Sequence, residues 1–240
     1  MNIISSKSTK EYINITISSL TSILLLAPAG LYANPTGEKV VKGSATFERN
    51  GKNLKVTNSP GARINWQDFS IARDERTHFQ QRNQRSSVYN RVVGGKPSNI
   101  FGTLSSNGRV YLVNPQGVIF GRNSRVDAAG FVASTMDFIA NGSGVYKFSK
   151  DSKQLGSQAG NIINKGKITS HFGGDVWLVG ENVNNEGVIE VDKGRVVLAA
   201  GNEVTITDSA APELSVTIEA DKNKAVNIGC LLYTSPSPRD

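Results

Sequence analysis

NRVVGGKPSNIFGTLSSNGRVYLVNPQGVIFG, residues 90–121, is the stretch of sequence that decides the fold. Short apolar runs at 110–113 and 118–120 alternate there with Gly, Asn and Pro, the residue types that favour tight corners. The stretch carries no acid, histidine or cysteine in a catalytic arrangement. We therefore expect it to build the strands and corners of a fold, not to perform chemistry.

The same pattern continues along the chain, with hardly a helix signal. Period-two alternation and β-branched runs recur between turn residues, most clearly at 40–47, 54–56, 176–179 and 196–199. These signals predict an all-β protein. A conventional β-sandwich would show the same local signals, so the strands alone do not fix the architecture.

An internal repeat favours a solenoid. NKGKI at 164–168 is echoed by NEGVI at 185–189, and GDVWL at 174–178 is echoed by GRVVL at 194–198. A period of about twenty residues without helical spacing is typical of one coil of a parallel β-helix, whose coils bury their inward residues against one another. The asparagines should then stack at one corner of successive coils, and we expect a third, looser copy at 201–206. Leucine-rich repeats share the period, but their spaced leucines are absent.

Both ends of the chain differ from the middle. Residues 1–33 have a basic front, an apolar run and small residues before Asn34, which predicts a secretory signal peptide cleaved after Ala33. Cleavage after Ala29 is the alternative site. A membrane anchor is the rival interpretation, but the apolar run is shorter than the roughly 18 residues that would span a bilayer.

The last residues, CLLYTSPSPRD at 230–240, contain the only cysteine and resemble a translated sequencing adapter, so we interpret them as an artefact outside the fold. A Pro-rich linker to a following domain is the other interpretation. The expected domain, 34–229, therefore has no cysteine, which suits a chain that crosses a membrane unfolded. Its mildly basic charge (net +7 for the whole chain) indicates no particular partner.

Several motifs occur in the order that one protein family shows. They are Asn34-Pro35-Thr36-Gly37, GSAT at 43–46, WQDFSI at 66–71, FQ at 79–80, NRV at 90–92, PSNIFG at 97–102, Asn114-Pro115-Gln116-Gly117-Val118, and GFVAST at 130–135. In this order they resemble the N-terminal secretion domain of two-partner-secretion exoproteins, the filamentous-haemagglutinin-like adhesins. Gln116 stands where the family usually has Asn, and a second Asn-Pro-Asn-Leu motif is missing. The segment 82–91 is more similar to the branch of high-molecular-weight adhesins and haem-haemopexin-binding exoproteins.

The resemblance implies a right-handed parallel β-helix with hairpins outside it, which we expect around the Arg-rich segment 73–91. It implies export to the cell surface through the periplasm and an outer-membrane β-barrel transporter whose periplasmic modules recognise the chain. The implied recognition residues are Asn114, Pro115, Gln116, Gly117 and Val118, with Asn90 and Arg91. Pro115 also fits the first central position of a β-turn, so the motif could serve only as a fold-defining corner. A host-surface ligand would bind through a part of the exoprotein downstream of this domain.

The sequence offers little for chemistry. His78 and His171 have no Cys or Glu at ligand spacing. A β-helix polysaccharide lyase would need clustered carboxylates, and Asp175 and Asp192 have no companions. We predict no catalytic residue, no cofactor and no metal; a free-standing β-helix binder of a haem carrier or glycan is the alternative function. Scattered arginines without a recognition motif predict no nucleic-acid partner. These arginines are Arg73, Arg76, Arg82, Arg85 and Arg91.

Overall fold

Three sheets form the faces of a coiled chain. The computed structural model describes residues 33–140, 144–150, 160–208, 214–220 and 222–234. Sheet A contains, in order, β1 (Lys39–Lys42), β4 (Ala62–Trp66), β6 (Ser87–Val92), β9 (Arg109–Val113), β12 (Gly130–Ser134), β17 (Val176–Gly180) and β20 (Val196–Ala200). Sheet B contains β7 (Ser98–Ile100), β10 (Val118–Phe120), β15 (Asn161–Asn164), β18 (Asn182–Asn185) and β23 (Lys224–Asn227). Sheet C contains β2 (Ala45–Asn50), β3 (Asn53–Asn58), β5 (Arg76–Gln80), β8 (Thr103–Ser106), β11 (Arg125–Ala128), β16 (Lys167–Ser170), β19 (Val188–Asp192) and β24 (Cys230–Thr234).

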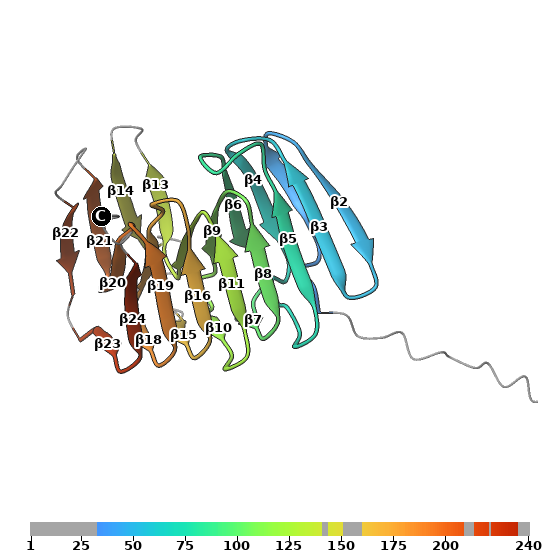
Figure 1. The fold of residues 1–240 in the computed structure, drawn as a ribbon. Coiled ribbons are helices and arrows are strands. Elements are labelled where there is room, and N and C mark those ends of the chain that lie inside the picture. Colours follow the sequence, from blue (N-terminus) through green and yellow to red (C-terminus); the bar gives the residue numbers. More distant parts are fainter. Residues whose placement is uncertain (1–32, 141–143, 151–159, 209–213, 221, 235–240) are drawn as a thin grey trace, which may run out of the picture. The chain divides into compact units, whose positions relative to one another are not determined.

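From β7 onward, apart from two hairpins, the chain visits sheets B, C and A in turn, and each strand of these sheets pairs in parallel with its counterpart one coil away (Figure 1). Asn161 pairs with Asn182, 21 residues on, and its side-chain oxygen accepts a hydrogen bond from that residue. In sheet A, Val176 pairs with Val196. The predicted parallel β-helix with a period near twenty is therefore confirmed.

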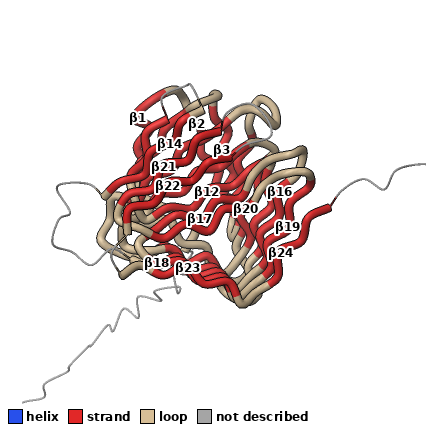
Figure 2. The backbone as a smooth tube through the Cα atoms, turned by 90° about the vertical axis from the view of Figure 1, so that its left-hand side faces the viewer, coloured by secondary structure: helices blue, strands red, loops and turns tan. Residues whose placement is uncertain are grey.

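The interior of the coils is apolar. Side chains from all three sheets meet there, and Figure 2 shows the sheets enclosing this interior. At the N-terminal end it is filled by aromatic rings: Trp66 packs edge-on against Phe47 and Phe69, with ring centroids 5.6 and 5.5 Å apart. Alternation on sheet C matches this burial, because Leu54 and Val56 of β3 point inward while Lys55 is exposed.

A fourth, antiparallel sheet lies outside the coils. Sheet D contains β13 (Asp137–Ala140), β14 (Val145–Ser149), β21 (Glu203–Asp208) and β22 (Leu214–Glu219). It covers the outer face of sheet A (Figure 2). There Tyr111, Val132 and Trp177 pack against Phe148 and other residues of sheet D to form a second core. Strands β9, β12 and β17 are consequently buried on both faces.

The extra hairpins were expected around residues 73–91, and that placement is wrong. Residues 76–80 and 87–92 form β5 and β6, which are parallel rungs of sheets C and A. The arginines of this segment look like a polar loop in the sequence, but Arg76 and Arg91 occupy outward positions on strands whose alternate residues face the core. The hairpins instead interrupt later coils, after β12 and after β20.

The predicted stacking of asparagines at one corner is confirmed. Asn164 Nδ2 donates to Asn185 Oδ1 at 2.7 Å, and Asn185 Nδ2 donates to Asn227 Oδ1 at 2.7 Å. The expected third copy at 201–206 is wrong, because residues 203–206 lie within β21 of sheet D. The third copy begins instead at Asn227, since the hairpin β21–β22 delays the next coil.

Part of the C-terminal segment belongs to the fold. Residues 230–240 were expected to lie outside it, but Cys230–Thr234 form β24 and pair in parallel with β19. Leu231 packs against the interior core, which an extended apolar segment can do beside an open strand edge. The pairing does not bear on the origin of the segment, and residues 235–240 are outside the described residues.

Candidate functional site

The motif Asn114–Val118 forms the corner that joins β9 to β10. Gly117 N donates to Asn114 O at 3.0 Å, which closes the predicted β-turn with Pro115 at its first central position. Gln116 N donates to the side-chain Oδ1 of Asn114 at 2.9 Å. Asparagine thus caps its own turn, a role for which its short amide side chain is suited.

The other half of the Asn114 amide joins the coils together. Its Nδ2 donates to Lys96 O at 3.0 Å and to Ser98 Oγ at 2.9 Å, both in the preceding coil. Its backbone N donates to Ser134 O of the following coil at 2.9 Å. The exposed fraction of Asn114 is 0%. Every polar group of this buried residue therefore has a partner, as burial requires.

The neighbours of Asn114 leave little of the corner accessible. Gly117 has a φ of +113°, and a Cβ there would lie 2.9 Å from Asn161 O of the next coil. Gly160 N donates to Pro115 O at 2.8 Å, so the next coil sits directly on the corner. Pro115 and Val118 are buried, whereas Gln116 is half-buried and lines a shallow groove over sheet B.

Asn90 and Arg91 lie on β6, next to the strand that leads into the corner. Asn90 points inward with 1% exposure, accepts a hydrogen bond from Trp66 Nε1 at 2.9 Å, and donates to Tyr111 O at 3.3 Å. Arg91 points outward and makes a two-pronged ion pair with Asp137 of sheet D, at 2.7 Å for both nitrogens. The structure therefore places these two residues on opposite faces of sheet A, and they do not form one surface with Asn114.

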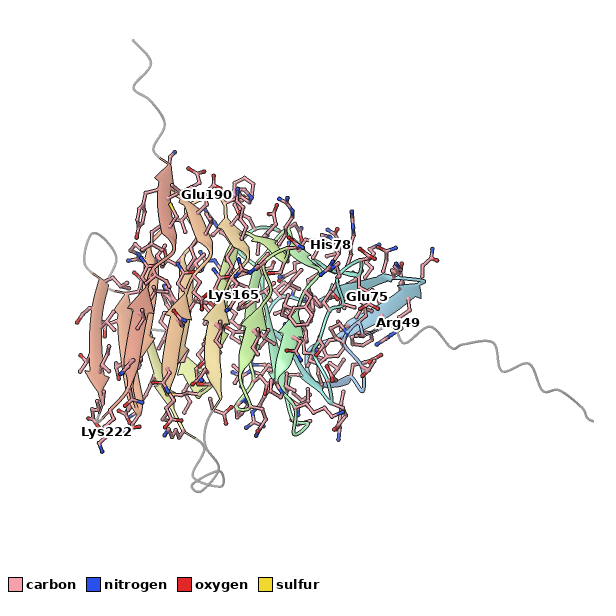
Figure 3. All side chains as sticks on the ribbon, turned by 90° about the horizontal axis from the view of Figure 1, so that it is seen from below. Arg49, Glu75, His78, Lys165, Glu190 and Lys222 are labelled. Atoms are coloured by element: carbon pink, nitrogen blue, oxygen red, sulfur yellow. The ribbon has the colours of Figure 1, made fainter. Side chains whose placement is uncertain are left out.

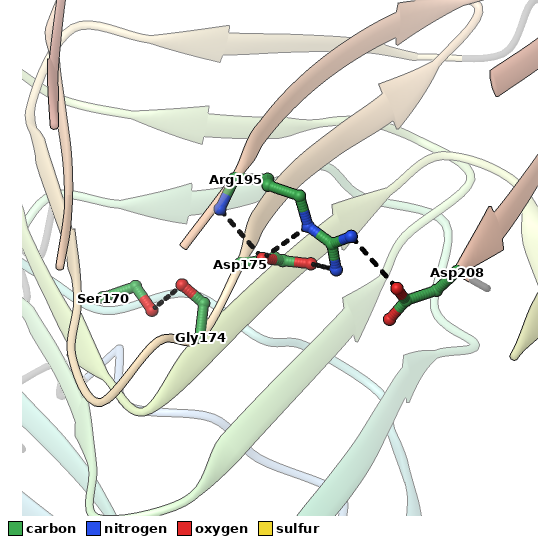
Figure 4. A network of polar contacts seen from close by, with 5 residues as sticks. All are labelled: Ser170, Gly174, Asp175, Arg195 and Asp208. Carbon is green, nitrogen blue, oxygen red and sulfur yellow. Dashed lines mark hydrogen bonds and ion pairs between the residues drawn. The ribbon is translucent and has the colours of Figure 1, made fainter. Parts of the chain in front are cut away.

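One polar network was missed by the sequence analysis (Figure 4). Arg195 contacts Asp175 through Nη2 at 2.7 Å and Nε at 3.3 Å, and its Nη1 lies 3.0 Å from Asp208 Oδ1. The hydrogen bonds to Asp175, and then to Asp208, raise the pKa of Arg195 above its ordinary value. Asp175 and Arg195 occupy equivalent positions of the two repeat copies, GDVWL and GRVVL, which was the available signal.

A small cavity lies beside this network, between sheets A and D. It is lined by Tyr111, Tyr146, Trp177 and Arg109, among others. Burial raises the pKa of Tyr111 and of Tyr146 above the ordinary value for tyrosine. Trp177 Nε1 is buried and has no hydrogen-bond partner among the described residues.

The residues considered for chemistry lie apart from one another. His78 Nδ1 is 2.9 Å from Ser105 Oγ, and His171 Nε2 is 3.0 Å from Asp127 Oδ1. Within the described ranges, no group of three or more His, Cys, Asp or Glu side chains is placed to hold a metal ion. No helix within these ranges has the length and hydropathy to cross a membrane.

The predicted cleavage site lies at the N-terminal end of the described chain. Asn34 is 6% exposed, and Ala33 N donates to Glu75 Oε1 at 2.7 Å. The remaining leader residues, including the alternative site at Ala29, are outside the described residues. The structure therefore anchors Ala33 and Asn34 against the first coils.

The chain is similar in sequence to known proteins. The sequence profile described as "TPS secretion domain" matches residues 31–230. The heme/hemopexin-binding protein of Haemophilus influenzae strain Rd is 36% identical over 195 residues, which cover 77% of this chain and 21% of that protein. A second Haemophilus influenzae protein of the same description is 36% identical over 140 residues, which cover 55% of this chain and 15% of that protein. The chain thus spans about a fifth or less of the length of these relatives.

A solved structure is similar as well. The crystal structure of the HMW1 secretion domain from Haemophilus influenzae superposes with a TM-score of 0.75 at 38% sequence identity. The match covers 82% of this chain and 53% of that one. The similarity therefore extends over most of the chain.

Proposed function

Because the chain belongs to the family of TPS secretion domains, we propose that it passes through the periplasm, is recognised there by an outer-membrane transporter, and templates a β-helix once outside the cell. The family assignment itself rests on the match over residues 31–230. Domains of this family belong to exported adhesin-like proteins and work with an outer-membrane transporter.

The transporter's periplasmic modules recognise the chain before it folds. In the folded domain the exposed fraction of Asn114 is 0% and that of Asn90 is 1%, so neither side chain is accessible to a partner. An unfolded segment, in contrast, presents its backbone for strand addition, where main-chain hydrogen bonds supply affinity and side-chain pockets supply selectivity. Asn114 and Gly117 then act after export, by setting the corner on which the coils stack.

Once outside, the domain templates further coils. At the last described rung within residues 34–229, β23 lies at the edge of sheet B, with apolar side chains still exposed there and in the turn that follows. These are Val226 (41%) and Ile228 (73%). A formed rung lowers the cost of ordering the next because stacking is nearest-neighbour. The template function concerns any coil that follows this edge in the parent protein.

The processing and domain limits are also part of the proposal. A leader at 1–33 directs the chain to the periplasm and is removed after Ala33, which frees the secretion domain at 34–229. The relatives named as heme/hemopexin-binding proteins are several times longer than this chain. We assign ligand binding of that kind to downstream parts of such a protein, and no catalytic step to this domain.

A secretion assay with two matched variants tests the proposal. The whole chain, with its leader, is expressed with and without the transporter encoded beside the gene, and released protein is measured. We expect transporter-dependent release. Asn114→Ala should reduce the folded, protease-resistant fraction of the released protein, because it removes the turn cap and leaves Lys96 O and Ser98 Oγ without a buried donor.

Gln116→Ala is the control, since this side chain is the accessible one at the corner. If the corner shapes the fold, Gln116→Ala should be released and folded normally. Loss of release in Gln116→Ala with unchanged stability of the purified domain would show instead that the transporter contacts the folded corner. Retention of the unaltered chain in the periplasm beside a working transporter would favour a free-standing β-helix binder.

A further inference from the structure

Glu75 is a buried carboxylate with an unusual set of partners. Its exposed fraction is 3%, and it lies near the N-terminal end of the coils, where Figure 3 labels it. Oε1 accepts a hydrogen bond from Ala33 N at 2.7 Å, and Oε2 accepts one from Ala72 N at 2.9 Å. Among the described residues, Glu75 has no ion pair with Lys, Arg or His.

A carboxylate in such a place normally has a positive partner. Removing an ionised group from water is costly unless it is paired and hydrogen-bonded, and two backbone N–H donors supply only part of the compensation. Two cations at the N-terminal end of the coils, Lys52 and Arg49, are already engaged with other carboxylates. Lys52 lies 3.3 Å from Asp74, and Arg49 lies 2.8 Å from Glu38.

The donor at Oε1 is the peptide nitrogen of the residue that precedes the expected cleavage point. Cleavage after Ala33 would remove this nitrogen and create an α-ammonium group on Asn34. Consecutive residues are about 3.8 Å apart between Cα atoms, so the new charge arises within one residue of the carboxylate. The positive charge that Glu75 lacks would therefore be made by processing.

Asn34 is held in place independently of the residue before it. Its Nδ2 donates to Lys52 O at 2.9 Å, and its Oδ1 accepts a hydrogen bond from Thr77 Oγ1 at 2.9 Å. Thr77 is itself fully buried on β5. The side chain of Asn34 would thus keep the new terminus beside Glu75 after the leader has left.

We propose that Glu75 is the docking site for the α-ammonium group of the processed chain, and that the ion pair stabilises the first coil only after cleavage. The inference rests on the proposed processing after Ala33. The α-amino pKa should rise above its usual range of about 7.7 to 8.0, because the charged form is favoured by the carboxylate. The added stability is therefore fully present below that range and is lost as the pH rises through the raised pKa.

The first test is the N-terminal residue of the chain released by the transporter, determined by mass spectrometry. A start at Asn34 is expected. A start at Gly30, with normal release, would overturn this inference and leave the proposed secretion function intact. Failure of release altogether would count against the secretion function, and the two results are therefore distinguishable.

The second test is a double-mutant cycle on the released full chain. Glu75→Gln, which keeps the size and an acceptor, is compared in chains that begin at Asn34 and in chains that retain residues 30–33. The urea-unfolding equilibrium should shift about tenfold more in the chain that begins at Asn34, the equivalent of one pKa unit. Equal shifts in both backgrounds would overturn the proposal. Asp74→Asn, which alters an exposed neighbouring carboxylate, is the control and should show no such coupling.

A third measurement needs no variant. Titration of the α-amino group by NMR in the chain that begins at Asn34 should give a pKa above its usual range, and in the extended chain a pKa within it. If Glu75→Gln does not fold, this titration still decides the matter. An unshifted pKa in the chain that begins at Asn34 would refute the docking site.

Discussion

At the residue scale, Asn114 shows how a turn residue becomes a core residue. It caps its own turn through Oδ1 and reaches the preceding coil through Nδ2. The turn could be predicted from the order Asn-Pro-x-Gly, because it depends on adjacent residues. The burial could not, because Lys96 and Ser98 meet Asn114 only when two coils stack.

The glycine of the same corner gives a direct test of this packing. Gly117→Ala forces an L side chain to a φ of +113° and brings its Cβ to 2.9 Å from Asn161 O. We expect a loss of roughly 1–3 kcal/mol in the free energy of unfolding. Urea denaturation measures it. Gly95→Ala, at a site with no atom within 4 Å of the added Cβ, is the control and should change stability by less than about 0.5 kcal/mol.

Tyr111 predicts how the fold responds to alkali. Burial raises its pKa above the ordinary value, so the folded state holds the phenolic proton more tightly than the unfolded state. Stability is therefore complete below the unfolded tyrosine pKa of about 10 and falls as the pH rises above it. Circular dichroism along an alkaline titration should show unfolding in this range, and Tyr111→Phe should move it to higher pH. Tyr233→Phe, at an exposed site, should not; a shared shift would refute burial as the cause.

At the scale of elements, two kinds of strand differ in a way that the sequence records. Strands of sheet C alternate between buried and exposed residues, as in Lys167–Ser170. Strands of sheet A such as Val176–Gly180 are buried throughout. Continuous apolar runs are typical of strands covered on both faces. The runs were predicted as strands, but the second layer they imply, sheet D, was not located, and arginines at 73–91 were interpreted as a hairpin instead.

The link between sheets A and D can be weakened at one residue. Arg195→Ala removes the contacts to Asp175 and Asp208, and leaves Asp175 with 15% side-chain exposure and no cation. Because the guanidinium is itself 35% exposed and solvent screens it, we expect a loss of about 1–2 kcal/mol. Hydrogen exchange should accelerate in β14 and β21. Arg125→Ala, an exposed arginine on sheet C, should leave these amides protected; equal acceleration in both variants would contradict the link.

At the scale of the whole molecule, the stacking of coils was the part of the fold most readily predicted. The echoes at 164–168 and 185–189 correspond to rungs in direct register. The next rung was misplaced because an inserted hairpin puts Asn227, not a residue near 206, beside Asn185. A repeat found by its spacing alone is lost when an insertion lies within a coil. The stack of hydrogen-bonded asparagines, Asn164, Asn185 and Asn227, continues in spite of the insertion.

Loss of a buried asparagine from the stack Asn164–Asn185–Asn227 should destabilise the fold more than loss of an exposed asparagine. Asn185→Ala leaves Asn164 Nδ2 and Asn227 Oδ1 without their partner in the stack, and Asn164 is fully buried. We expect a loss of about 1–3 kcal/mol. Asn161→Ala removes the outward Asn161–Asn182 contact of 3.2 Å in solvent and should have a much smaller effect. Thermal or urea unfolding compares them, and similar losses would mean that the stack has no special role.

The two ends of the stack have unlike surfaces. At the N-terminal end, the edge strands β1 and β2 carry Lys39, Lys42, Glu48 and Arg49, charges that discourage pairing with another chain. At the other end, β23 and the turn after it leave the apolar side chains of Val226 and Ile228 exposed. Free domains in concentrated solution should therefore adhere through one end only. Such contacts close after two molecules, so self-association should stop at dimers and should not proceed to fibrils.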